Sequence, residues 1–149
     1  MLLPVAADTV DAVCRGIVVG REVAPGWPHD DTAIGLGYVR TGGVGFLILD
    51  DEGRVAGECG TKTAPAADGT VEIGYGLAPR SRGRGLGGRA VGELVEWLVD
   101  QVGVTAVEAE IHVSNTASRR LVERLGFATD GAPAHGYLRY RRAAIRGSS

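Results

Sequence analysis

Arginine and glycine make up nearly all of a ten-residue segment, Arg80 to Arg89, with the sequence RSRGRGLGGR. Glycines let the backbone turn tightly and approach a ligand closely. If a helix begins here, its first unpaired N–H groups and the positive end of its dipole face the same space, which favours an anion. Arginine side chains add charge-assisted contacts to phosphate. The segment therefore predicts a phosphate-binding turn; the competing interpretation is a solvated helix start whose arginines only maintain solubility.

The turn also matches the spacing of a dinucleotide-binding pattern. Gly83, Gly85 and Gly88 fit its three glycines, and Glu108 lies at about the distance expected of a ribose-binding acid. In that pattern the first glycine follows its strand directly, whereas residues 78–82 intervene here. The glycines are also not followed by the Lys-Ser or Lys-Thr pair of a P-loop. A nucleotide-binding protein that uses this turn for another ligand remains an alternative.

The elements on either side of the turn have clear periodicities. Residues 71–77 alternate, with the large apolar side chains at odd positions and Glu72, Gly74 and Gly76 on the other face, which predicts a strand. Residues 86–101 carry an apolar stripe at helical spacing, which predicts an amphipathic helix. The turn is therefore expected to join a strand to the start of a long helix.

Further elements follow on both sides. Before the turn, we predict strands at 1–5, 44–49 and 55–61, a helix after Asp8-Thr9 with Val10, Val13, Cys14 and Ile17 on one face, and a weaker helix after Asp30-Asp31-Thr32. After it, we predict strands at 107–113, 127–129 and 137–142 and a helix at 116–125 with Asn115 as its N-cap. The strand at 137–142 is expected at a sheet edge. This order predicts a mixed α/β fold of the α+β type, with a mixed sheet.

Composition limits the classes of protein. At 149 residues the chain has room for one domain, residues 1–149, and not for two. Apolar residues at 44% and charged residues at 23% are typical of a globular protein. The net charge of −2 argues against a nucleic-acid partner. Without a membrane-spanning run or a signal-peptide pattern, we expect no membrane association and a cytoplasmic location.

Cysteines and histidines are spread too widely for a metal or redox site. Cys14 and Cys59 lack metal-type or redox-type spacing and are interpreted as small buried hydrophobic residues. His29, His112 and His135 are distant from one another in the sequence. We therefore predict no metal.

Four segments together resemble the GNAT acetyltransferase superfamily. Arg82, Gly85 and Gly87 match its pyrophosphate-binding motif, preceded by residues 71–75 (VEIGY) and followed by residues 115–121 (NTASRRL) and 125–127 (LGF). The closest likeness is to the RimJ/RimL branch of ribosomal-protein N-terminal acetyltransferases, which also includes small-amine and aminoglycoside acetyltransferases. The resemblance covers residues 69–130, an expected acetyl-CoA-binding core, while residues 1–68 match only in outline as an acceptor-side half.

The resemblance implies a fold and a cofactor site. The implied fold is a mostly antiparallel mixed sheet with flanking helices and one parallel strand pair that splays apart to admit acetyl-CoA. The backbone of Tyr75, Gly76 and Leu77 would pair with the pantetheine arm, and Asn115 would bind near its acetyl end. The diphosphate would be held by the turn, whose implied cofactor-binding residues are Arg82, Gly83, Arg84, Gly85, Leu86, Gly87 and Gly88.

The expected chemistry is direct attack of a primary amine on the thioester in a ternary complex. A carboxylate is the usual base for the amine, and Glu72 and Glu110 resemble positions used for this in parts of the superfamily; the alternative for each is an ordinary solvated or ion-paired glutamate. Where many family members carry an acidic tyrosine this chain has Val122, so the resemblance points to Ser118 as the hydroxyl for the leaving thiolate. The backbone N–H near Leu77 would polarise the thioester oxygen.

The sequence leaves the acceptor and the assembly open. The acceptor amine is either a peptide or protein N-terminus or a small molecule. Val122 motivates a different class, a CoA-binding module without catalysis. The expected edge strand at 137–142 would support a homodimer.

Overall fold

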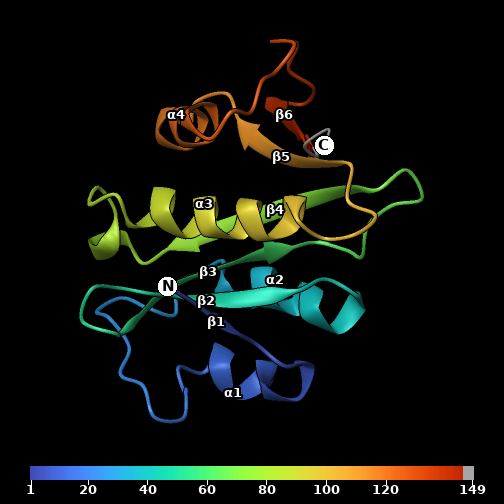
Figure 1. The fold of residues 1–149 in the computed structure, drawn as a ribbon. Coiled ribbons are helices and arrows are strands. Elements are labelled where there is room, and N and C mark those ends of the chain that lie inside the picture. The colour runs from blue at the N-terminus through green and yellow to red at the C-terminus, as the bar shows by residue number, and fades with distance from the viewer. Residues whose placement is uncertain (146–149) are drawn as a thin grey trace.

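Within residues 1–145, the part of the chain that the computed structural model describes, the strands form one six-stranded sheet whose spatial order follows the chain (Figure 1). The strands are β1 (Leu2–Pro4), β2 (Gly45–Leu49), β3 (Val55–Thr61), β4 (Thr70–Leu77), β5 (Ala106–His112) and β6 (Tyr137–Ala143). The helices are α1 (Val10–Cys14), α2 (Thr32–Gly37), α3 (Leu86–Val99) and α4 (Thr116–Arg124), with 3₁₀ turns at Ala7–Thr9, Tyr38–Thr41 and Pro79–Ser81.

One parallel pair interrupts an otherwise antiparallel sheet. Among the described strands, β4 and β5 run parallel, since α3 connects them as a crossover, while the other neighbouring strands pair antiparallel. The β4–β5 pairing runs from Thr70 opposite Ala106 to Ile73 opposite Ala109 and stops there, although both strands continue. The predicted mixed sheet with a splayed parallel pair is confirmed.

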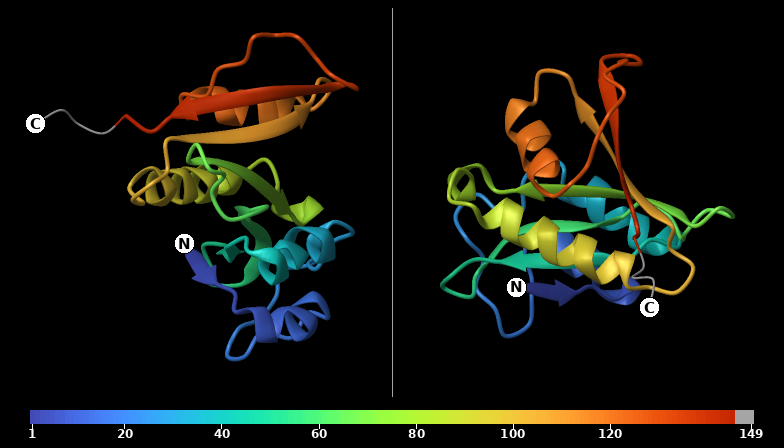
Figure 2. Two further views of the ribbon diagram at one scale, coloured as in Figure 1. Left: turned by 90° about the vertical axis from the view of Figure 1, so that its right-hand side faces the viewer. Right: turned by 45° about the horizontal axis from the view of Figure 1, so that its top comes forward.

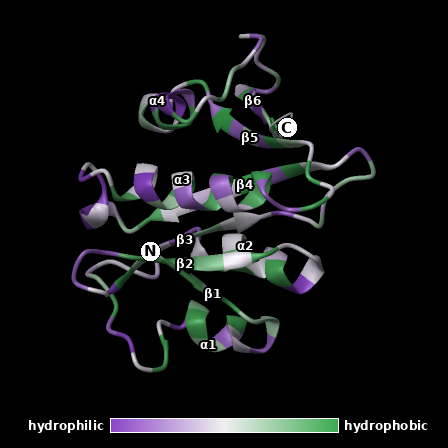
Figure 3. Ribbon diagram, in the orientation of Figure 1, coloured by the Kyte–Doolittle hydropathy of each residue, from purple (hydrophilic) through white to green (hydrophobic). Residues whose placement is uncertain are grey.

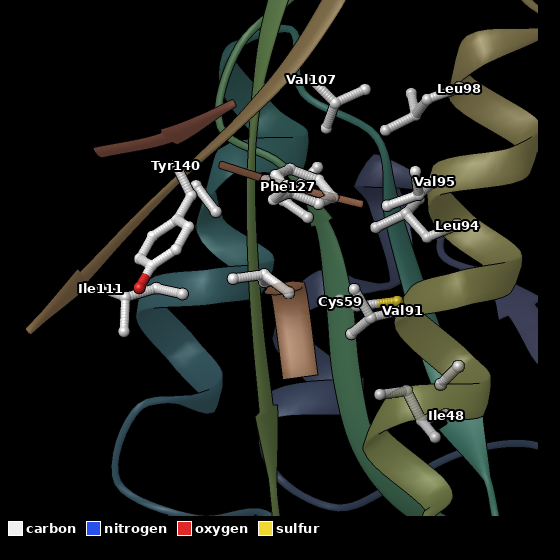
Figure 4. Packing of buried hydrophobic residues seen from close by; sticks show 14 of the residues in the cluster. Ile48, Cys59, Val91, Leu94, Val95, Leu98, Val107, Ile111, Phe127 and Tyr140 are labelled. Atoms are coloured by element: carbon white, nitrogen blue, oxygen red, sulfur yellow. The ribbon is translucent and has the colours of Figure 1, made fainter. Parts of the chain in front are cut away.

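Helices cover both faces of the sheet. Figure 2 shows α3 on one face and α2 on the other. The larger core lies under α3, whose Val91, Leu94, Val95 and Leu98 point toward the strands in Figure 4. The second core packs α1 and α2 against the other face, with Trp27 buried in it. Unlike these helices, α4 carries mostly hydrophilic residues (Figure 3), and of its residues only Val122 is buried.

Two local expectations are wrong. The helix α1 ends at Cys14, because Gly16 turns the backbone with a φ of +82°, and Ile17 is therefore 56% exposed instead of lying on the helix stripe. Residues 127–129 are not a strand: Phe127 packs into the core, and only Ala128 forms a single bridge, to Arg141.

The expected edge strand and the expected burial of Cys59 are confirmed, whereas Cys14 is only half-buried. β6 ends the strand order and directs Arg139 and Arg141 to Glu108 on β5. Burial raises the pKa of the Cys59 thiol to about 12, which keeps it protonated. Among the described residues, no helix combines the length and the apolar composition that a bilayer crossing requires.

Removing a core side chain should test the placement of α3. Leu94 is fully buried, so Leu94→Ala is expected to lower the free energy of unfolding by about 2–5 kcal/mol in urea denaturation. Val102 is 97% exposed, and Val102→Ala is expected to change the free energy of unfolding by less than about 0.5 kcal/mol. Equal effects of the two substitutions would contradict the described packing.

Candidate active site

The end of β4 presents unpaired backbone to the gap beside β5. The amide of Lys62 donates to the carbonyl of Glu72, and the amide of Ala78 donates to the carbonyl of Ala56, so the even-numbered residues of β4 hydrogen-bond to β3. The odd-numbered residues therefore direct their N–H and C=O groups toward β5. Beyond Ile73, no described strand pairs with that edge, and it leaves the backbone of Tyr75 and Leu77 facing the gap.

Gly76 differs from its two neighbours. Its own N–H and C=O point to β3, where it lies opposite Glu58. We expected Tyr75, Gly76 and Leu77 all to pair with one extended ligand. Only Tyr75 and Leu77 direct their backbone N–H and C=O groups toward the gap where that ligand would lie. The carbonyl of Leu77 already accepts a hydrogen bond from Nε of Arg82 at 3.2 Å.

The glycine-rich turn leads from β4 into the N-terminus of α3. Gly83 and Gly85 have φ angles of +77° and +78°, which side-chain-bearing residues rarely adopt, and Gly85 is the N-cap of α3. In the part of the chain that the structure describes, no side chain caps the first N–H groups of α3. A Cβ atom added at Gly83, Gly85 or Gly88 would meet nothing within 4 Å, so the space in front of these amides is open. Uncapped donors at an open helix N-terminus fit a diphosphate group.

The arginines of the turn have different partners. Arg82 is held on the end of β4 by the hydrogen bond already described, and Arg89 pairs with Asp51 at 3.2 Å. Arg84 is exposed and lies beside the turn with Arg80 and Ser81, at the rim of a pocket of about 230 Å³. Cationic side chains thus surround the open amides.

The N-terminus of α4 forms the opposite wall of the gap. The Asn115 side chain accepts a hydrogen bond from the Ser118 amide at 3.2 Å, which confirms the predicted N-cap. Burial raises the pKa of the Tyr75 phenol, and the neighbouring Ser118 hydroxyl opposes that rise. The phenol oxygen is buried and has no hydrogen bond of normal geometry to the described chain, so a polar group at the gap lacks a full partner.

Both carboxylates predicted as the base are paired with cations. Glu72 accepts from Nζ of Lys62 at 2.5 Å and lies 3.7 Å from Arg139. Glu110 lies 3.4 Å from the same arginine. Each carboxylate thus already has a cationic partner, and the catalytic roles of both residues stay predictions.

A buried acid that the sequence reasoning missed lies across β4 from the gap. The Glu58 side chain, on β3, is only 5% exposed. Its Oε1 accepts hydrogen bonds from Nε1 of Trp27 at 3.1 Å and from the Thr32 hydroxyl at 2.7 Å. Its Oε2 lies 2.8 Å from Nε2 of His29. These partners come from the loop before α2 and from the first residue of α2.

The hydrogen bonds of His29 indicate its tautomer. Its Nδ1 accepts from the Asp31 amide at 3.3 Å, so the ring proton lies on Nε2 and is donated to Glu58. The ring and the carboxylate pack on Gly76: a Cβ atom there would lie 2.6 Å from Oε2 of Glu58 and 2.8 Å from the His29 ring. Only glycine fits at this position without displacing the pair.

A pocket of about 380 Å³ opens beside this pair. It is bounded by α2 on one side and, on the other, by the C-terminal half of β3 and by Gly74 and Tyr75 of β4. Its lining includes Asp31, Ile34, Tyr38, Glu58, Lys62 and Tyr137. The pocket, on the α2 face of the sheet, thus reaches β4 at Gly74 and Tyr75, just beyond the last β4–β5 pair at Ile73, where the gap opens.

The structure brings most of the predicted site residues together. The turn at 82–88, Tyr75, Leu77, Asn115 and Ser118 all border the gap. Glu58 and His29 were missed because these two residues, which contact each other, are 29 residues apart in the sequence. One available signal was Glu58 itself, the only charged residue within the otherwise apolar and small-residue run at 55–61.

A family model describes most of this chain. The model of the Acetyltransferase (GNAT) domain matches residues 4–128. An uncharacterized N-acetyltransferase, p20 of Bacillus licheniformis, is 29% identical over 57% of this chain, and the match spans 48% of that protein, about half its length. The uncharacterized N-acetyltransferase YjdG of Bacillus subtilis is 26% identical over 73% of this chain and 71% of its own.

Solved structures share the fold. A RimL ribosomal L7/L12 α-N-protein acetyltransferase in complex with coenzyme A has a TM-score of 0.68 at 17% identity, over 95% of this chain and 92% of its own. A spermidine N-acetyltransferase SpeG chimera from Vibrio cholerae and hSSAT has a TM-score of 0.69 at 13% identity, over 97% of this chain and 96% of its own. At these identities the likeness is one of fold.

The buried hydrogen bonds of Glu58 can be tested by stability. Thr32→Val keeps the side-chain shape but removes the hydroxyl, which donates to Glu58 and accepts from the His29 amide. It is expected to lower the free energy of unfolding by about 1–3 kcal/mol in urea denaturation. Thr32→Ser keeps the hydroxyl and is expected to retain most of the stability. A Thr32→Val protein as stable as the wild type would show that this hydrogen bond is not formed.

Proposed function

The chain belongs to the GNAT acetyltransferase family, and from that premise we propose that it transfers an acetyl group from acetyl-CoA to a primary amine. The observation that carries the proposal is the combination, at the end of β4, of a strand edge without a partner and an open, uncapped helix N-terminus. The first suits an extended pantetheine arm and the second a diphosphate. Together they fit coenzyme A better than either fits alone.

The diphosphate is bound by the turn between β4 and α3. The N–H groups at 83–88 donate to its oxygens, and the dipole of α3 favours the negative charge. Arg84 and Arg82 add charge-assisted contacts. The open space in front of Gly83, Gly85 and Gly88 supports this assignment, because a side chain at any of them would occupy it.

The pantetheine arm lies along the β5-facing edge of β4. Tyr75 and Leu77 supply backbone groups, as a neighbouring strand would, and the Leu77 N–H polarises the thioester carbonyl. Asn115 contacts the arm near the acetyl end. Acetyl-CoA supplies an activated acyl group whose leaving group, a thiol with an ordinary pKa of about 8.5, departs readily as a thiolate.

Ser118 protonates the leaving thiolate in this proposal. Its hydroxyl neighbours the buried Tyr75 phenol, which has a raised pKa and so keeps its proton at neutral pH. Both groups lie at the gap where α4 approaches β4. Val122, at the position where many family members carry a tyrosine, is fully buried and contributes packing alone.

The acceptor is a primary amine of a protein N-terminus or a small molecule. The fold is shared with a ribosomal-protein acetyltransferase and with spermidine acetyltransferases, so fold alone does not choose between them. The two free cysteines suit a reducing compartment such as the cytoplasm. The exposed edge of β6 offers a surface for a homodimer.

A second candidate function is coenzyme A binding without catalysis, which the buried Val122 favours. Release of free thiol from acetyl-CoA in the presence of a panel of primary amines separates the two functions. Amine-dependent release at several times the rate without amine is expected. Tight coenzyme A binding with no release for any amine would favour the binding module, and stabilisation by NAD(P) but not by coenzyme A would favour the nucleotide-binding alternative.

Reversing one charge at the turn should weaken cofactor binding. Arg84→Glu is expected to raise the Kd for coenzyme A at least tenfold in calorimetry, because one charge-assisted contact contributes about 1.5–3 kcal/mol. Arg15→Glu is the matched control, since Arg15 is an exposed arginine that follows α1, outside the turn. An unchanged Kd for Arg84→Glu, or the same loss in both variants, would contradict the proposed phosphate site.

A further inference from the structure

Glu58 is a buried carboxylate with unused hydrogen-bonding capacity. Among residues 1–145, two donors bond to its Oε1 and one, His29, to its Oε2. Burying a carboxylate is costly even when it is hydrogen-bonded. The free lone pair of Oε2 therefore stands ready for one more donor, and the pocket lies beside it.

Glu58 lies next to the backbone that is proposed to hold the thioester. Glu58 is directly opposite Gly76 in the β3–β4 register. Gly76 in turn lies between Tyr75 and Leu77, the two residues whose N–H groups face the gap. The 2.6 Å approach of Oε2 to a Cβ built on Gly76 shows how closely the carboxylate is packed on this strand. A donor bound to Oε2 would therefore sit beside β4 at the level where the gap opens.

The charges around the pocket favour a cation. Lys62 is neutralised by Glu72, and His29 is neutral in its tautomer, so Glu58 and the exposed Asp31 leave the pocket with negative charge. The remaining walls include Ile34, Tyr38 and Tyr137, whose side chains suit the carbon chain of an amine. Aromatic faces also attract ammonium groups.

We propose that this pocket is the acceptor site, that it binds a primary amine as its ammonium ion, and that Oε2 of Glu58 accepts the ammonium proton. The inference rests on the proposed function. The freed nitrogen lone pair forms the C–N bond at the thioester carbonyl carbon, the C–S bond breaks, and the thiolate leaves. The amine loses its second proton as the amide forms, and the thiolate takes up a proton to give the free thiol.

His29 is a positioning residue for this step. Its Nε2–H donation orients the carboxylate so that the second lone pair of Oε2 points away from the ring. The Asp31 amide fixes the ring through Nδ1. Trp27 and Thr32 hold the other oxygen, so the carboxylate does not rotate.

Glu58→Gln is the direct test, since it keeps the shape of the side chain and an acceptor oxygen. For an amine with a pKa of about 10.4, the variant is expected to lose about 10²–10⁴-fold in kcat/KM at pH 7.5. The kcat/KM of Glu58→Gln should then rise about tenfold per pH unit up to pH 9.5. This variant can use only the free amine, whose fraction rises about tenfold per pH unit below the pKa of the amine. Wild-type kcat/KM should stay nearly flat over that range, because the enzyme takes up the abundant ammonium form.

Other titratable and charged groups lie near Glu58. His29 contacts it directly through Nε2. Burial raises the pKa of the Cys14 thiol on α1, and the charge of Glu58 adds to this rise. The remaining charged neighbours are Asp31 from the loop before α2 and the Lys62–Glu72 pair from β3 and β4.

Glu96→Gln is the matched control, because Glu96 lies on α3 and pairs with Arg142 outside the site. Glu58→Asp keeps a carboxylate and is expected to keep the flat profile at a lower rate. Coenzyme A affinity should be unchanged in Glu58→Gln, which shows that the variant is folded. If Glu58→Gln does not fold, the wild-type profile decides: a tenfold rise per pH unit in the wild type overturns the proposal.

Other results would also overturn it. If Glu58→Gln keeps kcat/KM within about threefold of the wild-type value at pH 7.5, Glu58 is not the base, although the protein still transfers acetyl groups. A pH-dependent loss in Glu72→Gln or Glu110→Gln instead moves the base to that residue. Wild-type protein that binds coenzyme A but acetylates no amine rejects the proposed function, and the acceptor site with it.

Discussion

The divergence of β4 from β5 beyond Ile73 and Ala109 is the constraint on which the site depends. β3 holds β4 to its end and β6 holds β5 to its end, so neither strand can bend to close the gap without losing its other partner. The backbone groups of Tyr75 and Leu77 are then left without a strand. Backbone donors and acceptors need partners, and in the proposed complex an extended ligand would supply them. The turn into α3 follows at once, so its open amides lie at the end of the same groove.

The two-residue period of β4 separates the parts of the reaction. Odd-numbered side chains turn toward α3 and α4, where the Tyr75 phenol neighbours Ser118. Even-numbered positions turn toward α2, where Gly74 and Gly76 leave room for the pocket and for Glu58. In the proposed reaction, the leaving group would thus lie on one face of this strand and the proton acceptor on the other. Because the strand is a single layer, the two meet at its backbone.

Local sequence patterns predicted the elements that position the site. Alternation over 71–77 and the apolar stripe from Leu86 defined β4 and α3. Asn115 was recognised as the cap of α4 because capping depends on neighbouring residues. The same locality explains the errors: the end of α1 depended on Gly16, and the Phe127 segment was too short to show a period.

Long-range pairing was beyond the sequence. Whether Glu72 is free or paired depends on Lys62 across the β3–β4 turn and on Arg139 from β6, neither of which a strand pattern can bring close. Glu58 becomes a buried, hydrogen-bonded carboxylate only when the loop containing Trp27 and His29 folds over it. Chemistry that depends on such contacts required the assembled sheet.

Amide hydrogen exchange with saturating coenzyme A tests the central claim most directly. The account predicts slower exchange at the amides of Tyr75, Leu77 and residues 83–88, with no change in the loop at 16–20. Coenzyme A binding, shown by calorimetry in the same sample, without protection of these amides would contradict it. The gap beside β4 would then not be the cofactor site.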